Sequence, residues 1–146
     1  MPVRTAHTTW NGGLQDGSGQ VDLTSSGRGT FDVSFPTRAA DAADGATSPE
    51  ELIAAAHSAC YAMQFSALLA EAGATSIALD VTADVHLGPD PAGGFRIPRI
   101  KLSVQGKVDG LDDARFREVA EQAKQTCPVS KALAGTTISL DAALAS

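Results

Sequence analysis

The chain has two cysteines, Cys60 and Cys127, and their surroundings favour thiol chemistry over disulfide stapling. Cys60 closes the Ala-rich stretch SPEELIAAAHSAC (residues 48–60), and Cys127 opens the stretch CPVSKAL (residues 127–133), directly before a proline. A redox pair requires the two sulfur atoms to meet, and across so long a separation only the fold can bring them together. If they do not meet, each cysteine is simply a small buried apolar residue.

The local context of each cysteine predicts a different reactivity. Cys127 precedes a proline that can begin a helix, so its sulfur is expected at the helix N-cap, where free amides and the helix dipole stabilise a thiolate. Cys60 is expected in the middle of a helix, where its thiol stays protonated unless a cation lies nearby. Local context alone therefore ranks Cys127 as the more reactive thiol.

Arg38 is the leading candidate for a cation beside a reactive thiol. A guanidinium keeps its charge and can hold a thiolate or a peroxide oxygen through several donors. Glu50 could orient Arg38 through a bidentate ion pair, although a glutamate in a first helical turn also simply complements the helix dipole. Arg28 and Arg4, in the same N-terminal region, are the alternatives if Arg38 is a solvated loop residue.

A long helix over residues 49–72 is predicted to carry Cys60. Ser48 can cap this helix, Pro49 suits its first position, Glu51 can complete a capping box with Ser48, and Gly73 can end it. The stretch is apolar on all sides and near the length of a bilayer crossing. Polar residues interrupt it and no basic residue flanks it, so a buried helix of a soluble domain is expected.

The spacing of Glu50 and Cys60 limits how they can share a site. They lie ten residues apart on one predicted helix, which corresponds to a rise of ~15 Å. They cannot meet on one straight helix. If they belong to one site, we predict that it forms between two subunits, with the long helix packed against its antiparallel copy.

The remaining elements give an α+β fold within a single domain covering residues 1–146. Alternating apolar residues and glycine-rich turns predict strands, and one face of apolar residues predicts a second helix on which Phe116, Val119, Ala120 and Ala123 are buried. The expected order is an antiparallel meander over 8–36, a loop over 38–47, the long helix, a hairpin over 77–108, a helix over 112–126, a short helix over 128–134 and a last strand over 136–142.

Composition excludes some partners. The chain of 146 residues is 43% hydrophobic and has a formal net charge of -6. This charge, without any run of Lys or Arg, argues against nucleic acid or an anionic membrane surface as partner. The N-terminal residues lack the apolar segment of a secretory signal, so we expect a cytoplasmic protein with reduced thiols.

Other chemistries find little support in the sequence. The histidines His7, His57 and His86 could join the cysteines as metal ligands, but no pair has zinc-site spacing. No Gly-x-Ser-x-Gly elbow and no glycine-rich phosphate loop occurs, so no bound cofactor is expected. The alternative is a non-enzymatic module that binds a small hydrophobic ligand, in which neither cysteine has a functional role.

The two cysteine stretches, together with WNGGL (residues 10–14) and FPTR (residues 35–38), resemble the osmotically inducible protein C family of hydroperoxide reductases (OsmC/Ohr). His57 and Val129 resemble the OsmC-like branch more than the organic hydroperoxide resistance branch. The resemblance implies antiparallel sheets wrapped around a long central buried helix in an intertwined homodimer.

The resemblance also implies a role for each site residue. Cys60 becomes the peroxidatic thiolate and Cys127 the resolving thiol, with Arg38 and Glu50 beside the Cys60 sulfur, which reverses the local ranking of the cysteines. The implied activity is the reduction of organic hydroperoxides, and less efficiently of hydrogen peroxide, in oxidative stress defence. The implied reductant is an external dithiol such as a lipoylated protein.

Overall fold

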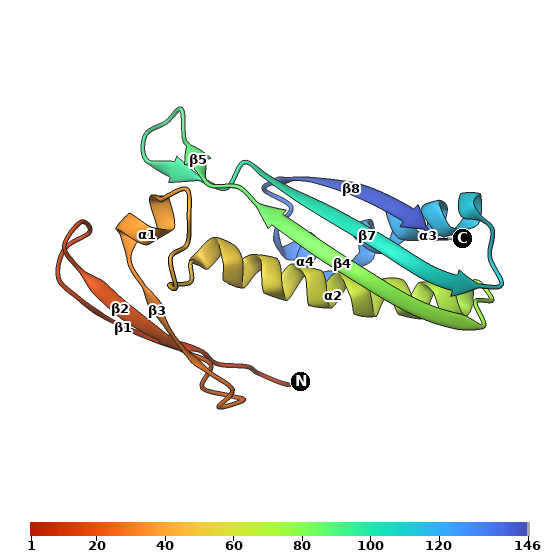
Figure 1. Cartoon of the computed structure of the whole chain (residues 1–146), viewed down its shortest axis with the longest axis horizontal. Helices are drawn as coiled ribbons and strands as arrows, with labels where there is room; N and C mark the ends of the chain where they lie inside the picture. Colours follow the sequence, from red (N-terminus) through yellow and green to blue (C-terminus); the bar gives the residue numbers. More distant parts are fainter. Residues whose placement is uncertain (146) are drawn as a thin grey trace. The chain divides into compact units, whose positions relative to one another are not determined.

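The computed structural model describes residues 1–145 (Figure 1). These residues fall into two compact units that divide between Leu52 and Ile53. Both units contain strands and helices, as the predicted α+β class requires. The elements in chain order are β1 (His7–Asn11), β2 (Ser18–Asp22), β3 (Thr30–Val33), α1 (Phe35–Ala39), α2 (Pro49–Glu71), β4 (Ser76–Val85), β5 (Gly88–Pro89), β6 (Phe95–Arg96), β7 (Arg99–Asp109), α3 (Asp113–Thr126), α4 (Pro128–Ala132) and β8 (Thr137–Leu144).

The first unit begins with the predicted antiparallel meander, a sheet in the order β1-β2-β3. The short helix α1 follows it, because the Ser34 side chain caps the Thr37 amide and Pro36 lies in the first turn. Arg38 lies in the last turn of α1. The predicted meander therefore extends too far at residue 36, since β3 ends at Val33, and the predicted loop begins too early at Arg38. The capping serine before a proline is the signal that identifies the helix.

Helix α2 begins and ends close to the predicted residues. The Ser48 hydroxyl accepts a hydrogen bond from the Glu51 amide at 3.1 Å, as a cap should. The Glu51 carboxylate instead accepts from the hydroxyl of Thr47, so only half of the predicted capping box forms. Gly73 ends the helix with a φ of 103°, a backbone conformation that residues other than glycine rarely adopt.

The second unit contains a three-stranded sheet in the order β4-β7-β8. Strands β4 and β7 form the predicted long antiparallel hairpin, and the small β5-β6 ribbon lies between them in the chain. Strand β8 joins β7 in parallel, a direction that its sequence does not reveal. Figure 1 shows the three strands side by side, with the connection through α3 and α4 between β7 and β8.

One face of α2 forms the core of the second unit. His57, Tyr61, Phe65 and Leu69 follow each other at intervals of four residues and are fully buried. Tyr61, Phe65 and Leu69 pack in one cluster with residues of β7 and with the predicted apolar face of α3, whose four buried residues are those expected from the sequence. The hydroxyl of Tyr61 donates to the Ala120 carbonyl at 3.0 Å, which fixes α2 against α3.

The opposite face of α2 is exposed in the single chain. It consists of small or apolar residues, among them Ala55, Ala59, Met63 and Ala67. Within residues 1–145, α2 is the one helix long and apolar enough to cross a bilayer by length and composition, a test that a core helix of a soluble protein also passes. The expected burial on all sides is not reached within one chain.

Candidate active site

The fold of the second unit brings the two cysteines into contact. Cys60 lies on α2 and Cys127 is the residue that precedes α4, and both are free thiols. The Cys127 Sγ–H donates to the Cys60 Sγ across 3.1 Å. The contact satisfies the condition for a redox pair, because one sulfur can attack the other with little movement of the backbone.

The two thiols differ in their surroundings. Burial raises the pKa of the Cys60 thiol, and the contact with Cys127 raises it further. The backbone N–H of Val129, in the first turn of α4, donates to the Cys60 sulfur and acts in the opposite direction by lowering its pKa. Cys60 thus receives a donor suited to a thiolate, although it still needs a cation to ionise readily.

The structure removes one premise of the local argument that ranked Cys127 as the more reactive thiol, namely that the Cys127 sulfur caps α4. Cys127 is at the N-cap of α4, as predicted, but its side chain makes no capping hydrogen bond. Its sulfur is fully buried, whereas Cys60 is partly exposed, and the free amide of Val129 is directed to Cys60. A peroxide can therefore reach Cys60 more easily than Cys127.

A buried polar pair lies beside the two sulfurs. The His57 Nε2 and the Ser130 Oγ are hydrogen-bonded at 2.7 Å, and both side chains are buried. Burial lowers the pKa of His57, so its ring is neutral at physiological pH. Across residues 1–145, no group of three or more His, Cys, Asp or Glu side chains is placed to hold a metal ion.

In the first unit, Arg38 and Glu50 form the predicted bidentate ion pair. The Arg38 Nε donates to both Glu50 oxygens at 2.9 and 3.1 Å, and Nη2 donates to Oε1 at 2.7 Å. The Glu50 side chain is buried and that of Arg38 is 32% exposed. Glu50 therefore fixes the plane of the guanidinium while leaving other N–H groups of Arg38 for a ligand.

Arg38 also lines an apolar cavity of about 370 Å³ within the first unit. The other lining residues are mostly apolar: Thr8, Trp10, Leu14, Val21, Val33, Ser34, Phe35, Pro49 and Leu52. A guanidinium at the wall of an apolar cavity suits a ligand with a polar head and an apolar tail. Of the alternatives, Arg4 donates to the neighbouring Val3 carbonyl at an exposed site, so Arg38 is the better placed arginine.

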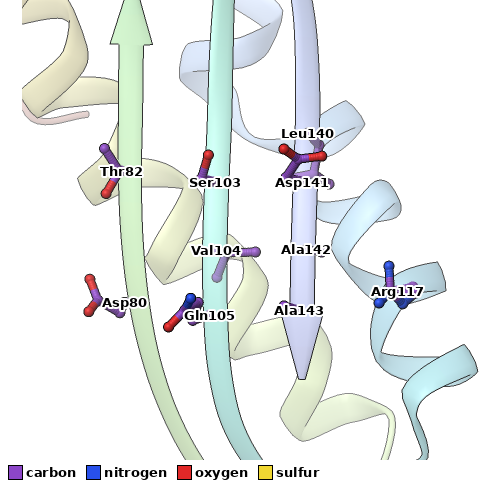
Figure 2. Close-up of a pocket in the computed structure, with 10 residues that line it drawn as sticks. All are labelled: Asp80, Thr82, Ser103, Val104, Gln105, Arg117, Leu140, Asp141, Ala142 and Ala143. Carbon is purple, nitrogen blue, oxygen red and sulfur yellow. The ribbon is translucent and has the colours of Figure 1, made fainter. Parts of the chain in front are cut away.

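A second hollow, of about 620 Å³, has a different character (Figure 2). It lies over strands β4, β7 and β8, and polar side chains such as Asp80, Thr82, Ser103 and Gln105 line it. Figure 2 shows Arg117 at its margin, on the helix beside β8. Its described lining includes neither cysteine, so it is not the thiol site.

The structure thus groups the four predicted site residues in pairs, Cys60 with Cys127 and Arg38 with Glu50. Sequence reasoning missed two further contributors, the Val129 amide and the Ser130 hydroxyl. The amide of the second residue of a helix that begins with proline is free to bind a sulfur, which is a usable signal for Val129. Nothing in the sequence pairs Ser130 with His57.

Comparisons with known proteins show which family the chain resembles. A family model described as "OsmC-like protein" matches residues 42–141, a range that includes Glu50 and both cysteines but not Arg38. Peroxiredoxin OsmC of Escherichia coli (strain K12) is 40% identical over 124 residues, which are 85% of this chain and 85% of that protein. The organic hydroperoxide resistance protein of Xanthomonas axonopodis pv. citri is 30% identical over 135 residues, 90% of this chain and 87% of that protein.

Solved structures show the same fold. The organic hydroperoxide resistance protein OhrB of Bacillus subtilis superposes with a TM-score of 0.70 and 29% identity, covering 97% of this chain and 98% of that one. An organic hydroperoxide resistance protein of Elizabethkingia anophelis gives a TM-score of 0.67 and 27% identity, covering 99% and 97%.

Proposed function

The chain belongs to the OsmC-like protein family, and from this premise we propose that it is a thiol-dependent peroxidase that reduces organic hydroperoxides in oxidative stress defence. The observation that carries the proposal is the contact of the Cys60 and Cys127 sulfurs at 3.1 Å, with the Val129 amide on the Cys60 sulfur. Relatives named peroxiredoxin and organic hydroperoxide resistance protein support the same chemistry.

The cycle begins at Cys60. Its thiolate attacks the terminal oxygen of the hydroperoxide, the O–O bond breaks, and the alkoxide takes a proton and leaves as the alcohol. Cys60 is then a sulfenic acid. Cys127 attacks this sulfur, the S–OH bond breaks, and the hydroxide leaves as water with the thiol proton, giving a disulfide. An external dithiol reduces the disulfide to two thiols and becomes a disulfide itself.

Arg38 and Glu50 complete the proposed site. In our proposal the Arg38 guanidinium stabilises the Cys60 thiolate and the departing alkoxide, and Glu50 holds the guanidinium in position. The ion pair and the apolar cavity beside it support these roles. The cavity favours hydroperoxides with an apolar tail over hydrogen peroxide.

We further propose that the enzyme is a homodimer. The exposed face of α2 is a long apolar surface, which is unfavourable in contact with water. It contains Ala55, Ala59, Met63 and Ala67. Packing against a second copy would bury it. The ten-residue spacing of Glu50 and Cys60 is also consistent with a site that uses residues of both subunits.

We also propose a reductant and a cellular location for the enzyme. A vicinal dithiol such as the lipoyl group of a lipoylated protein can reduce the Cys60–Cys127 disulfide in one exchange sequence. A cycle that returns both cysteines to thiols requires a reducing compartment, so we propose the cytoplasm. Comparison of dihydrolipoamide with glutathione as electron donor tests the first proposal, and cell fractionation tests the second.

The deciding experiment measures consumption of cumene hydroperoxide with a dithiol by the parent protein and by C60S. Turnover by the parent and its loss in C60S would establish the peroxidase. The apolar cavity leaves one other function, a carrier of a small hydrophobic ligand. If the parent consumes neither organic nor hydrogen peroxide, the peroxidase proposal fails and ligand binding takes its place.

A further inference from the structure

Two helical turns meet at two points beside the reactive sulfurs. On α2, His57 and Cys60 are three residues apart, and across from them Cys127 and Ser130 are also three residues apart. Cys60 contacts Cys127 at 3.1 Å, and His57 contacts Ser130 at 2.7 Å. The sulfur contact changes in every catalytic cycle, whereas the His57–Ser130 hydrogen bond contains no group that the cycle consumes.

The geometry defines the hydrogen bond. The His57 Nδ1 is buried and has no partner among residues 1–145. A buried N–H without an acceptor is the rarer and costlier arrangement, so the ring proton belongs on Nε2 and is donated to the Ser130 Oγ. The single proton of the neutral ring is committed to Ser130, and the one hydrogen bond of the ring among residues 1–145 is the bond to Ser130, not one to Cys60. Its role is to position the segment that carries Ser130.

We infer that His57 and Ser130 are positioning residues that hold the start of α4 against Cys60, so that Cys127 resolves the Cys60 sulfenic acid before a second peroxide oxidises it further. The inference rests on the proposed peroxidase function. While the sulfurs are not bonded to each other, the hydrogen bond keeps the Cys127 thiol within reach of its target.

Two reactions compete for the Cys60 sulfenic acid. Attack by Cys127 on the sulfenic acid yields the disulfide and water. Attack of the Cys60 sulfenate on a second hydroperoxide yields sulfinic acid and a second alcohol, and dithiols do not reverse that step. The first reaction is intramolecular, so its rate depends on how well the two sulfurs are oriented. Loss of the His57–Ser130 hydrogen bond slows the attack of Cys127 on the Cys60 sulfenic acid, so more of Cys60 becomes sulfinic acid.

The test compares variants that remove or keep the hydrogen bond. S130A and H57L remove one partner, and the double variant H57L/S130A removes both without leaving a polar group unpaired. H57Q keeps a donor near the position of Nε2 and should restore the bond. Y61F is the matched control, because it removes another buried hydrogen bond of α2, to Ala120, that does not involve α4.

Two readouts are measured. One is the fraction of Cys60 converted to sulfinic acid per turnover, determined by mass spectrometry with cumene hydroperoxide. The other is the midpoint potential of the Cys60–Cys127 disulfide in dithiothreitol buffers, which requires no peroxidase activity. For S130A and H57L/S130A we expect about tenfold more sulfinic acid per turnover, since orientation governs intramolecular attack. We expect about a tenfold weaker disulfide, which is a potential about 30 mV less negative.

The outcomes separate this inference from the proposed function. H57Q should behave like the parent, and Y61F should lose stability with both readouts unchanged. If S130A and H57L/S130A match the parent in sulfinic acid yield and potential, or if Y61F shifts them equally, the positioning role is refuted while the peroxidase stands. If the parent consumes no peroxide, the proposed function fails, and the potential alone still decides whether the pair holds the thiols together.

Discussion

Substitution of Glu50 by Gln tests whether this carboxylate acts only through Arg38. The pair is joined by three contacts of 2.7 to 3.1 Å, and Glu50 is buried. A hydrogen bond to a charged group contributes ~1.5–3 kcal/mol. The Arg38 side chain is 32% exposed, so water screens part of this energy and the lower end of the range applies. We therefore expect a coupling of about 1.5 kcal/mol.

This coupling sets the expected kinetic effect. A loss of about 1.4 kcal/mol in the stabilisation of the transition state is a tenfold loss of rate. E50Q should therefore lower kcat/KM for cumene hydroperoxide about tenfold. R38M, which removes the charge itself, should lower it by roughly 10²–10³, the scale found when a donor to a developing oxyanion is removed.

A double-mutant cycle on peroxide consumption checks the reasoning. In the R38M background, E50Q should have an effect below about twofold, because the guanidinium that Glu50 positions is gone. E51Q is the matched control, since Glu51 is the adjacent carboxylate and bonds to Thr47 instead of an arginine. Effects of E50Q and R38M that multiply, or an E51Q effect as large as that of E50Q, would refute the positioning role of Glu50.

The remaining predictions concern the thiols, the buried histidine and the exposed helix face. C60S should abolish peroxide consumption, whereas C127S should form one sulfenic acid per chain, detectable with dimedone; sulfenic acid in C60S instead would invert the roles. Burial lowers the pKa of His57 below its ordinary 6.5, so the unfolded chain binds the proton more readily. The free energy of unfolding, measured with urea, should thus fall as pH drops below about 6.5, and H57L should flatten this dependence; an unchanged slope in H57L would contradict it. A59E on the exposed face of α2 should produce monomers by sedimentation equilibrium, whereas A114E, at another exposed position, on α3, should leave the parent's state unchanged; a parent that is itself monomeric would contradict the dimer.

Local signals in the sequence predict much of the fold. Helix α2 lies within one residue of its expected bounds because Ser48 caps it and Gly73 ends it. The apolar face of α3 was predictable because its residues repeat at helical spacing. The direction of β8 was not, since strand direction depends on the route of the preceding chain and not on the strand's own pattern.

The site was harder to predict because its important contacts join residues far apart in the sequence. Local context placed the free amides of α4 at Cys127, whereas the packing of α2 delivers the Val129 amide to Cys60. The pairing of Arg38 with Glu50 was predictable from their charges, and the short helix that carries Arg38 was missed. The partnership of His57 with Ser130 depends on tertiary structure alone.

The parallel pairing of β7 with β8 determines when in folding the thiol pair can form. Parallel strands require a long crossover, and here the crossover over residues 110–136 contains α3, α4 and Cys127. Both ends of this crossover are fixed in the sheet only after β8 has paired with β7. Contacts of such large sequence separation form late, because loop closure precedes their stabilisation. In a newly synthesised chain, Cys60 therefore lacks its stable contact with Cys127 until β8 has paired with β7.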